Sequence, residues 1–243
     1  MNIIEINQLS KYYGKICGIK DVSFNVTKGE IFGFIGPNGA GKSTTIRTLL
    51  NFLFPSYIVK NSDKIKQRIG YLPAESNYYH NMTVRELMNY SASFYKIQDF
   101  EKRLKYLTDA LELDIQRKIS DLSSGNKKKV SIVQSLLHNP DLLILDEPTS
   151  GLDPLVQSVF YEILQEENKN GVTIFFSSHI LSEIQRICNR VAIIRQGKII
   201  KVESIENLKK NLLKNVHISF TETSPDCLDI KGIVKYQNNK KEI

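Results

Sequence analysis

A glycine-rich stretch, Gly36-Pro-Asn-Gly-Ala-Gly-Lys-Ser-Thr44, constrains the fold more than any other part of this 243-residue chain. It matches the P-loop pattern G-x-x-x-x-G-K-[ST]. Residues 30–35 before it predict a buried strand and residues 43–50 after it predict a helix, which is the context that the pattern requires. Backbone N–H groups of such a loop and the N-terminus of its helix attract phosphate oxygens. The sequence therefore predicts a phosphate-binding loop in an α/β fold.

The side chains of this loop have distinct expected roles. Lys42 is predicted to reach the β- and γ-phosphates of a nucleotide, and the Ser43 hydroxyl is predicted to bind Mg²⁺. The other predicted cofactor-binding residues of the loop are Asn38, Gly39, Gly41 and Thr44. The loop accordingly predicts a bound nucleotide and Mg²⁺.

A second candidate site is the segment Asp141-Leu-Leu-Ile-Leu-Asp146-Glu147. Its continuous apolar run predicts a strand that is buried on both faces of a parallel sheet, and ligands bind at the carboxyl ends of such strands. Asp146 is predicted to hold Mg²⁺, directly or through water. Glu147 is predicted to polarise the attacking water as the general base.

The composition is that of an ordinary globular protein, with 41% hydrophobic and 24% charged residues. No stretch reaches the roughly 18 apolar residues of a membrane-spanning helix, and the first residues do not resemble a secretory signal. Cys17, Cys188 and Cys227 lie far apart, which indicates reduced thiols in a cytosolic protein.

The net charge of +7 has two interpretations. A lysine-rich surface explains it without any partner, while contact with nucleic acid or an anionic membrane is the alternative. The lysines at 127–129 are interpreted as a solvated helix face, and no nucleic-acid partner is expected.

The order of predicted elements indicates a layered α/β domain with a helical insertion. Residues 2–35 alternate and contain turn residues, which predicts an antiparallel β-layer. Residues 83–113 have helical apolar spacing and begin with the capping-box pattern Thr83-Val-Arg-Glu86. Later strands and helices alternate, which predicts a parallel sheet with right-handed crossovers. The remaining predicted elements are helices at 126–138, 154–167 and 181–189 and strands at 172–177, 191–194 and 198–202.

The order of motifs over residues 1 to about 210 resembles that of the nucleotide-binding subunits of ABC transporters. Leu122-Ser-Ser-Gly-Asn126 resembles the family's signature motif, usually LSGGQ, with Ser124 and Asn126 as departures. Ser123 and Gly125, at the start of a helix, keep the expected phosphate-facing character. The resemblance implies that Lys42 of one chain and Ser123 of a second chain grip the same γ-phosphate.

Three further matches follow from the resemblance. Residues 150–153 resemble the loop that couples the two sites of a dimer, and His179 resembles the switch histidine that contacts the γ-phosphate. Tyr13 resembles the aromatic residue that stacks on adenine, with Tyr12 as the competing candidate. The predicted catalytic residues are thus Glu147, His179 and Lys42.

One family motif is altered. Ile69-Gly-Tyr-Leu-Pro73 matches the approach to the family's glutamine loop, but Ala74 occupies the glutamine position and Glu75 follows it. Alanine cannot bind Mg²⁺, so either Glu75 substitutes or the ion relies on Ser43 and Asp146. The altered loop resembles the drug, antibiotic and peptide exporter branch, which has separate permease subunits.

The resemblance implies a P-loop NTPase core with a parallel sheet, an N-terminal antiparallel β-layer and a helical subdomain at about 76–135. Residues 1–216 are predicted to form the nucleotide-binding domain, and residues 217–243 a short appendage. The expected function is MgATP hydrolysis in a head-to-tail homodimer that drives separately encoded permease subunits from the inner face of the cell membrane. The segment 75–84, with Tyr78, Tyr79 and His80, is the candidate permease contact.

Two other functions stay open. The first is a soluble ABC-type ATPase that acts as a mechanochemical switch on nucleic acid or ribosomes. The second is a regulatory ATP-binding module without turnover. A β-hairpin of the family is also missing near Phe54-Pro-Ser-Tyr57, and a long Ser56–Tyr57 Cα distance is predicted if residues have been left out there.

Overall fold

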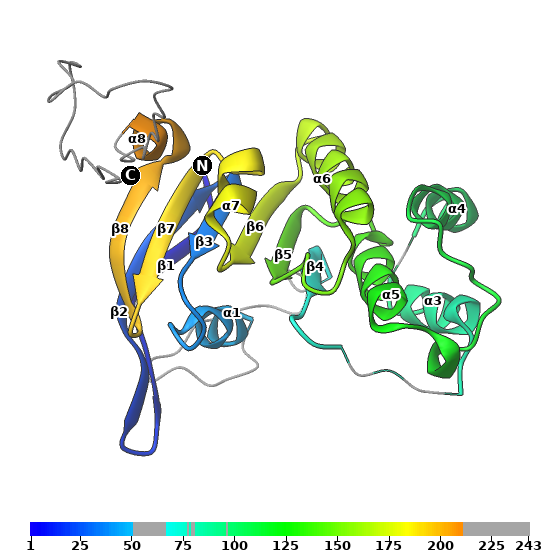
Figure 1. The fold of residues 1–243 in the computed structure, drawn as a ribbon, viewed down its shortest axis with the longest axis horizontal. Helices are drawn as coiled ribbons and strands as arrows, with labels where there is room; N and C mark the ends of the chain where they lie inside the picture. The colour runs from blue at the N-terminus through cyan, green and yellow to red at the C-terminus, as the bar shows by residue number, and fades with distance from the viewer. Residues whose placement is uncertain (51–66, 77, 79–80, 96, 211–243) are drawn as a thin grey trace, which may run out of the picture. The chain divides into compact units, whose positions relative to one another are not determined.

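The computed structural model describes residues 1–50, 67–76, 78, 81–95 and 97–210 (Figure 1). The strands are β1 (Asn2–Tyr13), β2 (Ile16–Thr27), β3 (Ile31–Ile35), β4 (Ile69–Leu72), β5 (Leu142–Asp146), β6 (Thr173–Ser178), β7 (Arg190–Arg195) and β8 (Lys198–Ser204). The helices are α1 (Lys42–Leu49), α3 (Val84–Ala92), α4 (Phe100–Ala110), α5 (Ser124–Leu136), α6 (Pro154–Lys169), α7 (Leu181–Ile187) and α8 (Ile205–Lys210), with a 3₁₀ turn at Ile119–Asp121.

The main sheet has the strand order β4-β5-β6-β3-β7-β8. Its first five strands pair in parallel, and every residue of β5 is buried, in agreement with the predicted continuous apolar run. The last strand, β8, is the exception and pairs antiparallel with β7. The cause is the turn at Gln196-Gly197, where both residues have positive φ, because a two-residue turn of this kind joins only antiparallel neighbours.

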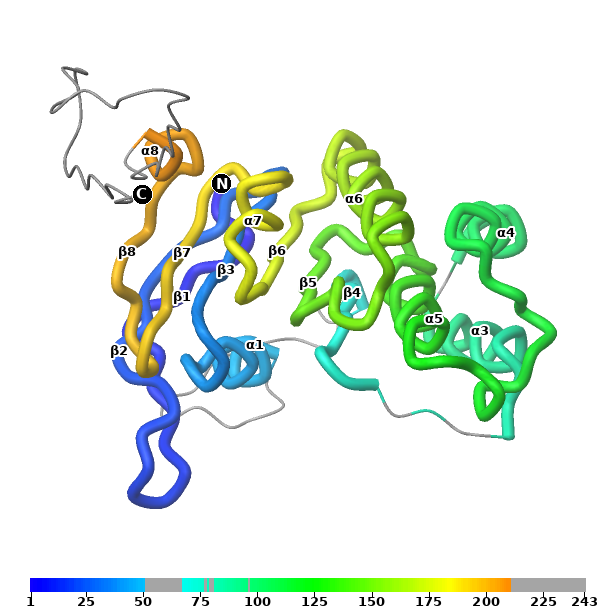
Figure 2. The backbone as a smooth tube through the Cα atoms, in the orientation of Figure 1, coloured from blue at the N-terminus to red at the C-terminus, as the bar shows by residue number. Residues whose placement is uncertain are grey.

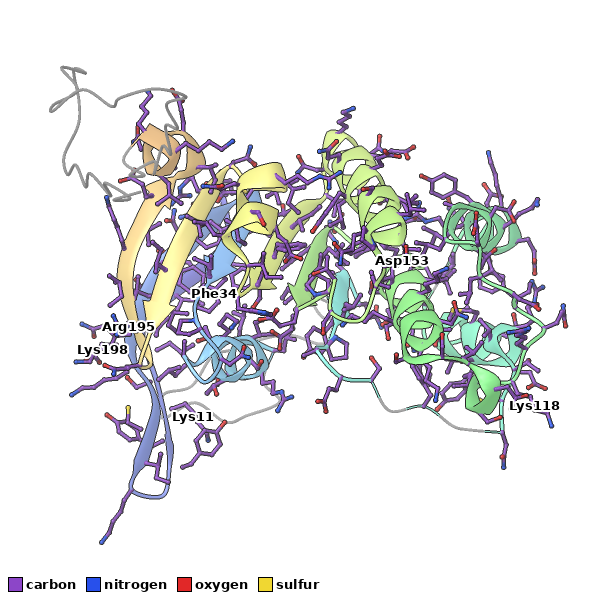
Figure 3. All side chains as sticks on the ribbon, viewed as in Figure 1. Lys11, Phe34, Lys118, Asp153, Arg195 and Lys198 are labelled. Carbon is purple, nitrogen blue, oxygen red and sulfur yellow. The ribbon has the colours of Figure 1, made fainter. Side chains whose placement is uncertain are left out.

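The predicted antiparallel layer is the two-stranded sheet of β1 and β2, which pair along strands of 12 residues each. The Phe24 ring of β2 lies 5.5 Å from the rings of Phe32 and Phe34 on β3 and 5.8 Å from that of Phe175 on β6. Figure 3 labels Phe34 on β3, where its side chain is fully buried. These stacked aromatic rings bury one face of the main sheet and support the strand that leads into the P-loop.

The strands of the main sheet carry buried side chains on both faces. Phe175 belongs to the core formed with β1, β2 and α1, while its neighbour Phe176 belongs to the core formed with α5, α6 and α7. Successive side chains of a strand point to opposite faces, so one apolar strand serves both cores. Figure 2 allows the backbone to be followed from β5 through α6 to β6 and on through α7 to β7. These crossovers place the carboxyl ends of β3, β5 and β6 at one edge of the sheet.

The helical insertion consists of α3, α4 and the 3₁₀ turn, and both helices pack against α5. The capping box predicted at the start of α3 is present. The Thr83 hydroxyl accepts from the Glu86 amide, and the Glu86 carboxylate accepts from the Thr83 amide at 2.8 Å. Such a cap stabilises a helix by about 1 kcal/mol.

Several sequence-based predictions fall outside the described residues. They include the Ser56–Tyr57 distance, the domain boundary at residue 217 and the positions of Tyr79 and His80. The described residues lie within one compact unit, and none of their helices is both long and apolar enough to cross a bilayer.

Candidate active site

The P-loop connects β3 to α1 and takes a shape that needs glycine at two positions. A Cβ atom on Gly36 would lie 2.3 Å from the Ile194 carbonyl oxygen of β7, so a side chain there would displace the backbone. Gly41 precedes α1 and has a φ of 105°, a conformation that other residues rarely adopt. The motif residues therefore form a tight turn against β7, as a phosphate-binding loop requires.

Lys42 occupies the first position of α1, and its ammonium group lies inside the loop. Its Nζ atom donates to the carbonyl oxygens of Gly36 at 2.7 Å and Pro37 at 3.2 Å, and it lies 3.1 Å from Glu147 Oε1. The structure thus brings the predicted phosphate-binding cation and the predicted base together. The other predicted loop residues differ in exposure: Asn38 and Gly39 are exposed, while Ser43 and Thr44 are half-buried.

Asp146 ends β5 and is completely buried. Its Oδ1 atom accepts from the Ser177 hydroxyl at 3.3 Å, and its Oδ2 atom has no hydrogen-bond partner among the described residues. Burial raises the pKa of Asp146, and hydrogen bonds from Ser43 and Ser177 oppose that rise. A buried carboxylate oxygen without a partner, next to a serine hydroxyl, fits a divalent cation.

The donors around Asp146 suit Mg²⁺ better than a transition metal. Mg²⁺ is usually bound by one or two protein oxygens together with substrate phosphates and waters. Within the described part of the chain, no group of three or more His, Cys, Asp or Glu side chains could hold a metal on its own. Ser43 and Asp146 therefore form a partial ligand set that the phosphates of a nucleotide would complete.

Glu147 adopts a left-handed backbone conformation with a φ of 47°. Its amide donates to the Ser177 carbonyl oxygen at 3.1 Å, which ties the residue to the end of β6. A non-glycine residue in this conformation costs of order 1–3 kcal/mol and persists only where its surroundings hold it. The sequence contains no local signal for this strain, which lies at the predicted base.

Both carboxylate oxygens of Glu147 have a charged or polar side chain beside them. Oε1 lies beside the Lys42 ammonium but has no aligned hydrogen bond among the described residues, so the ion pair provides its contact. Oε2 lies 2.8 Å from His179 Nδ1, and the histidine follows the end of β6 and is 45% exposed. Lys42, Glu147 and His179 thus form one chain of contacts across the ends of three parallel strands. This series of contacts combines a cation for phosphate, a carboxylate that can accept a proton and an imidazole that can donate a hydrogen bond.

The signature-like residues lie elsewhere in the chain. α5 begins at Ser124, two residues before the predicted start, because the exposed Ser123 side chain caps it by accepting from the Asn126 amide at 3.3 Å. Gly125 lies beside the loop at 150–153, since a Cβ atom there would lie 3.1 Å from the Gly151 carbonyl oxygen. None of the hydrogen bonds or ion pairs of the described residues joins these positions to Lys42, and Figure 2 shows the start of α5 apart from α1.

Tyr12 and Tyr13 both remain candidates for the residue that stacks on adenine. Tyr12 and Tyr13 end β1 and are both exposed, and the Lys11 ammonium lies 5.6 Å from the Tyr13 ring centre. Figure 3 shows Lys11 on this hairpin and Arg195 and Lys198 beside the β7–β8 turn. Both tyrosine side chains are exposed, so the choice of Tyr13 stays a prediction.

Lys128 overturns the interpretation of residues 127–129 as a solvated helix face. Its side chain is only 7% exposed, and its ammonium group donates to the carbonyl oxygens of Pro73 and Ala74 at 3.2 Å each. Burial lowers the pKa of Lys128 to about 8, and the carboxylates of Asp146 and Glu147 oppose this shift. The lysine joins α5 to the altered loop, whereas Glu75 is exposed. Sequence reasoning missed this contact because the spacing of three lysines does not reveal which one faces inward.

Tyr78 is not the exposed aromatic residue that the permease hypothesis assumed. It is half-buried, packs against the core and shares a hydrogen bond with Ser131 of α5. The exposed apolar side chains nearby are Tyr90 and Phe94, at the end of α3, whose rings meet edge to face at 5.1 Å.

Comparisons with known proteins identify the family. The family model for ABC transporters matches residues 19–150. The bacitracin transport ATP-binding protein BcrA of Bacillus licheniformis is 35% identical over 238 residues, covering 90% of this chain and 76% of that protein. The solved structure of an ATP-binding subunit of an ABC transporter has a TM-score of 0.78 at 30% identity, covering 85% of this chain and 91% of its own. A dimeric ATP-binding cassette with ADP and Pi shares the fold, with a TM-score of 0.73 at 23% identity over 83% of this chain and 98% of its own.

The matched residues include the P-loop and the acidic end of β5, which carry most of the site described above, and also the signature-like segment. The α/β architecture predicted from the motif order is also that of the solved ATP-binding subunit. The chain belongs to the ABC transporter family, as an ATP-binding subunit that hydrolyses ATP.

Proposed function

We propose that the chain is the MgATP-hydrolysing subunit of an ABC exporter. The observation that carries this proposal is the run of contacts from Lys42 through Glu147 to His179, at the edge where β3, β5 and β6 end. In this proposal Lys42 binds the β- and γ-phosphates, and Ser43 and Asp146 would hold Mg²⁺, which would offset the charge that develops on the phosphate oxygens.

Hydrolysis then needs a water in line with the γ-phosphate and a group that accepts its proton. Glu147 accepts the proton from that water. His179 contacts the γ-phosphate, and its Nδ1 atom lies 2.8 Å from the Glu147 carboxylate. When phosphate oxygens occupy the loop, Lys42 exchanges its ion pair with Glu147 for them, which releases Glu147 Oε1 for the water.

A second copy of the chain completes the site in this proposal. Ser123 and its helix N-terminus are exposed and are not bonded to the P-loop of their own chain. In a head-to-tail pair, the signature-like segment of one copy faces the P-loop of the other. The same two surfaces therefore meet at both nucleotide sites of the pair. The dimeric cassette that shares this fold supports the arrangement. The loop at 150–153 lies against Gly125 and so connects the two sites.

The transport role rests on the relatives, which include a bacitracin transport protein and a linearmycin resistance protein of Bacillus subtilis. We infer that the chain works at the inner face of the cell membrane with separately encoded permease subunits. Their contact includes residues 75–84 and the exposed Tyr90–Phe94 pair of the helical subdomain. The transported molecule is chosen by the permease.

The test is coexpression with a candidate permease, a polytopic membrane protein sought in the reading frames beside the one that encodes this chain. We expect a stable complex in detergent whose ATPase activity changes when the permease is present, and a Phe94→Ser variant should form less of it. Phe100→Ser is a matched control, because that ring lies in the same subdomain but packs against the core. Recovery of the chain on ribosomes or on nucleic acid, with no permease complex, would instead support the soluble switch.

The altered glutamine loop yields a prediction about Mg²⁺. If Glu75 takes over part of the role of the absent glutamine, Glu75→Ala should raise the Mg²⁺ concentration needed for half-maximal hydrolysis. Ala74→Gln should lower it. ATPase rates measured across a Mg²⁺ titration check both variants, and three superimposable curves would leave Ser43 and Asp146 as the whole protein ligand set.

A further inference from the structure

The buried carboxylate of Glu183 contacts the segments that carry the proposed catalytic residues. Glu183, in the first turn of α7, is 7% exposed. Its Oε1 atom accepts from the Thr149 hydroxyl at 2.6 Å, and its Oε2 atom accepts from the Ser178 hydroxyl at 2.5 Å. An ionised carboxylate only accepts hydrogen bonds, so both hydroxyl protons must point at it.

The two hydroxyl groups belong to the segments that carry the proposed base and the switch histidine. Thr149 lies two residues after Glu147, and Ser178 directly precedes His179. The Ser178 hydroxyl also accepts from the Ile180 amide at 3.0 Å, so His179 is flanked by bonded residues on both sides. One carboxylate therefore connects two segments that are about thirty residues apart in sequence.

A third element meets the same carboxylate. The Tyr161 hydroxyl of α6 hydrogen-bonds to Glu183, and burial together with this carboxylate raises the pKa of Tyr161. The Arg186 guanidinium lies over the Tyr161 ring at 4.6 Å. The cluster of Glu183, Thr149, Ser178 and Tyr161 thus ties α6 and α7 to the ends of β5 and β6.

We propose that Glu183 is a positioning residue for ATP hydrolysis, which holds Glu147 and His179 against each other through the hydroxyl groups of Thr149 and Ser178. The inference rests on the proposed roles of Glu147 and His179. Its physical basis is that Glu147 has a strained backbone, which relaxes unless the residues after it are anchored. Because a misplacement of about 1 Å can cost about 100-fold in rate, loosening the anchor should reduce catalysis before it reduces binding.

The test measures kcat and KM for ATP in purified variants. Glu183→Ala should lower kcat by about 10- to 100-fold with little change in KM. Glu183→Gln should recover part of the loss, because its amide oxygen still accepts one hydroxyl proton. Thr149→Val and Ser178→Ala each remove one of the two bonds with little change in volume. They should each lower kcat by less than Glu183→Ala does, and they carry the test if Glu183→Ala does not fold.

Glu167→Gln is the matched control. Glu167 is an equally buried glutamate on α6, but it pairs with Arg103 of α4, outside the cluster. This variant should lose stability without losing kcat. A wild-type kcat for Glu183→Ala, or an equal loss for Glu167→Gln, would overturn the inference.

A double variant separates this inference from the function on which it rests. Adding Glu183→Ala to Glu147→Gln should cause a much smaller loss of turnover than Glu183→Ala causes in the wild type, because one of the two groups that it positions can no longer accept a proton. An equal loss in both backgrounds would mean that Glu183 acts by another route. If Glu147→Gln is inactive while the Glu183 variants turn over normally, only the positioning role fails; if Glu147→Gln retains wild-type turnover, the proposed base itself fails.

Discussion

Replacing Glu147 with glutamine should lower ATP turnover by about 100- to 10,000-fold while leaving ATP binding nearly intact. The amide keeps the shape of the side chain, and its oxygen still offers a contact to Lys42 or His179. It cannot accept a proton from water, so the chemical step fails. Turnover measured by phosphate release, beside the affinity for a fluorescent ATP analogue, separates the two effects.

The same variant should accumulate the nucleotide-bound pair of subunits. If hydrolysis is what separates the two copies, a chain that binds ATP without hydrolysing it should elute as a dimer in size-exclusion chromatography with MgATP. Glu162→Gln on the exposed side of α6 is the control, since it makes the same chemical change outside the site. Hydrolysis by Glu147→Gln within a few-fold of wild type would rule out Glu147 as the base.

Replacing Lys42 with alanine should weaken nucleotide binding itself. A hydrogen bond to a charged group contributes about 1.5–3 kcal/mol, which corresponds to about 10- to 150-fold in affinity. The Lys42 ammonium is already confined inside the loop by Gly36 and Pro37, so little side-chain entropy is lost when phosphates replace these partners. Titration with the fluorescent ATP analogue measures the change directly.

The variant also removes the cation beside Glu147, whose side chain is largely buried. Thermal unfolding should therefore be recorded with the affinity, so that a folding defect is not mistaken for a binding defect. Lys169→Ala, at the exposed end of α6, removes the same charge away from the site. An affinity equal to that of the wild type would mean that the P-loop does not bind phosphate as proposed.

Much of the fold was predictable because its signals are local. The P-loop pattern, the apolar run of β5 and the Thr83 capping box each lie within a few consecutive residues, and each appears where the sequence predicted it. The antiparallel pairing of β8 depends on the turn at Gln196-Gly197.

Other features depend on which residues meet across the folded chain. Lys128 is buried, although its neighbours 127 and 129 are not, because α5 presents that one position to the carbonyl groups of Pro73 and Ala74. Glu183 gave no sequence signal either. An acidic residue in the first turn of a helix is ordinary at a surface, and only the approach of Thr149 and Ser178 makes it a buried acceptor.

The sequence by itself determined the family, the nucleotide-binding loop and most of the order of strands and helices, since these follow from contiguous patterns of backbone and side-chain chemistry. Only the tertiary structure decided how the charges are partnered. It placed Lys42, Glu147 and His179 in successive contact, and it left one oxygen of Asp146 without a partner among the described residues. It also bonded Glu183 to the segment that follows Glu147. The physical reason is that the free energy of a charged group depends on its burial and its neighbours, and for these residues the neighbours come from distant parts of the chain.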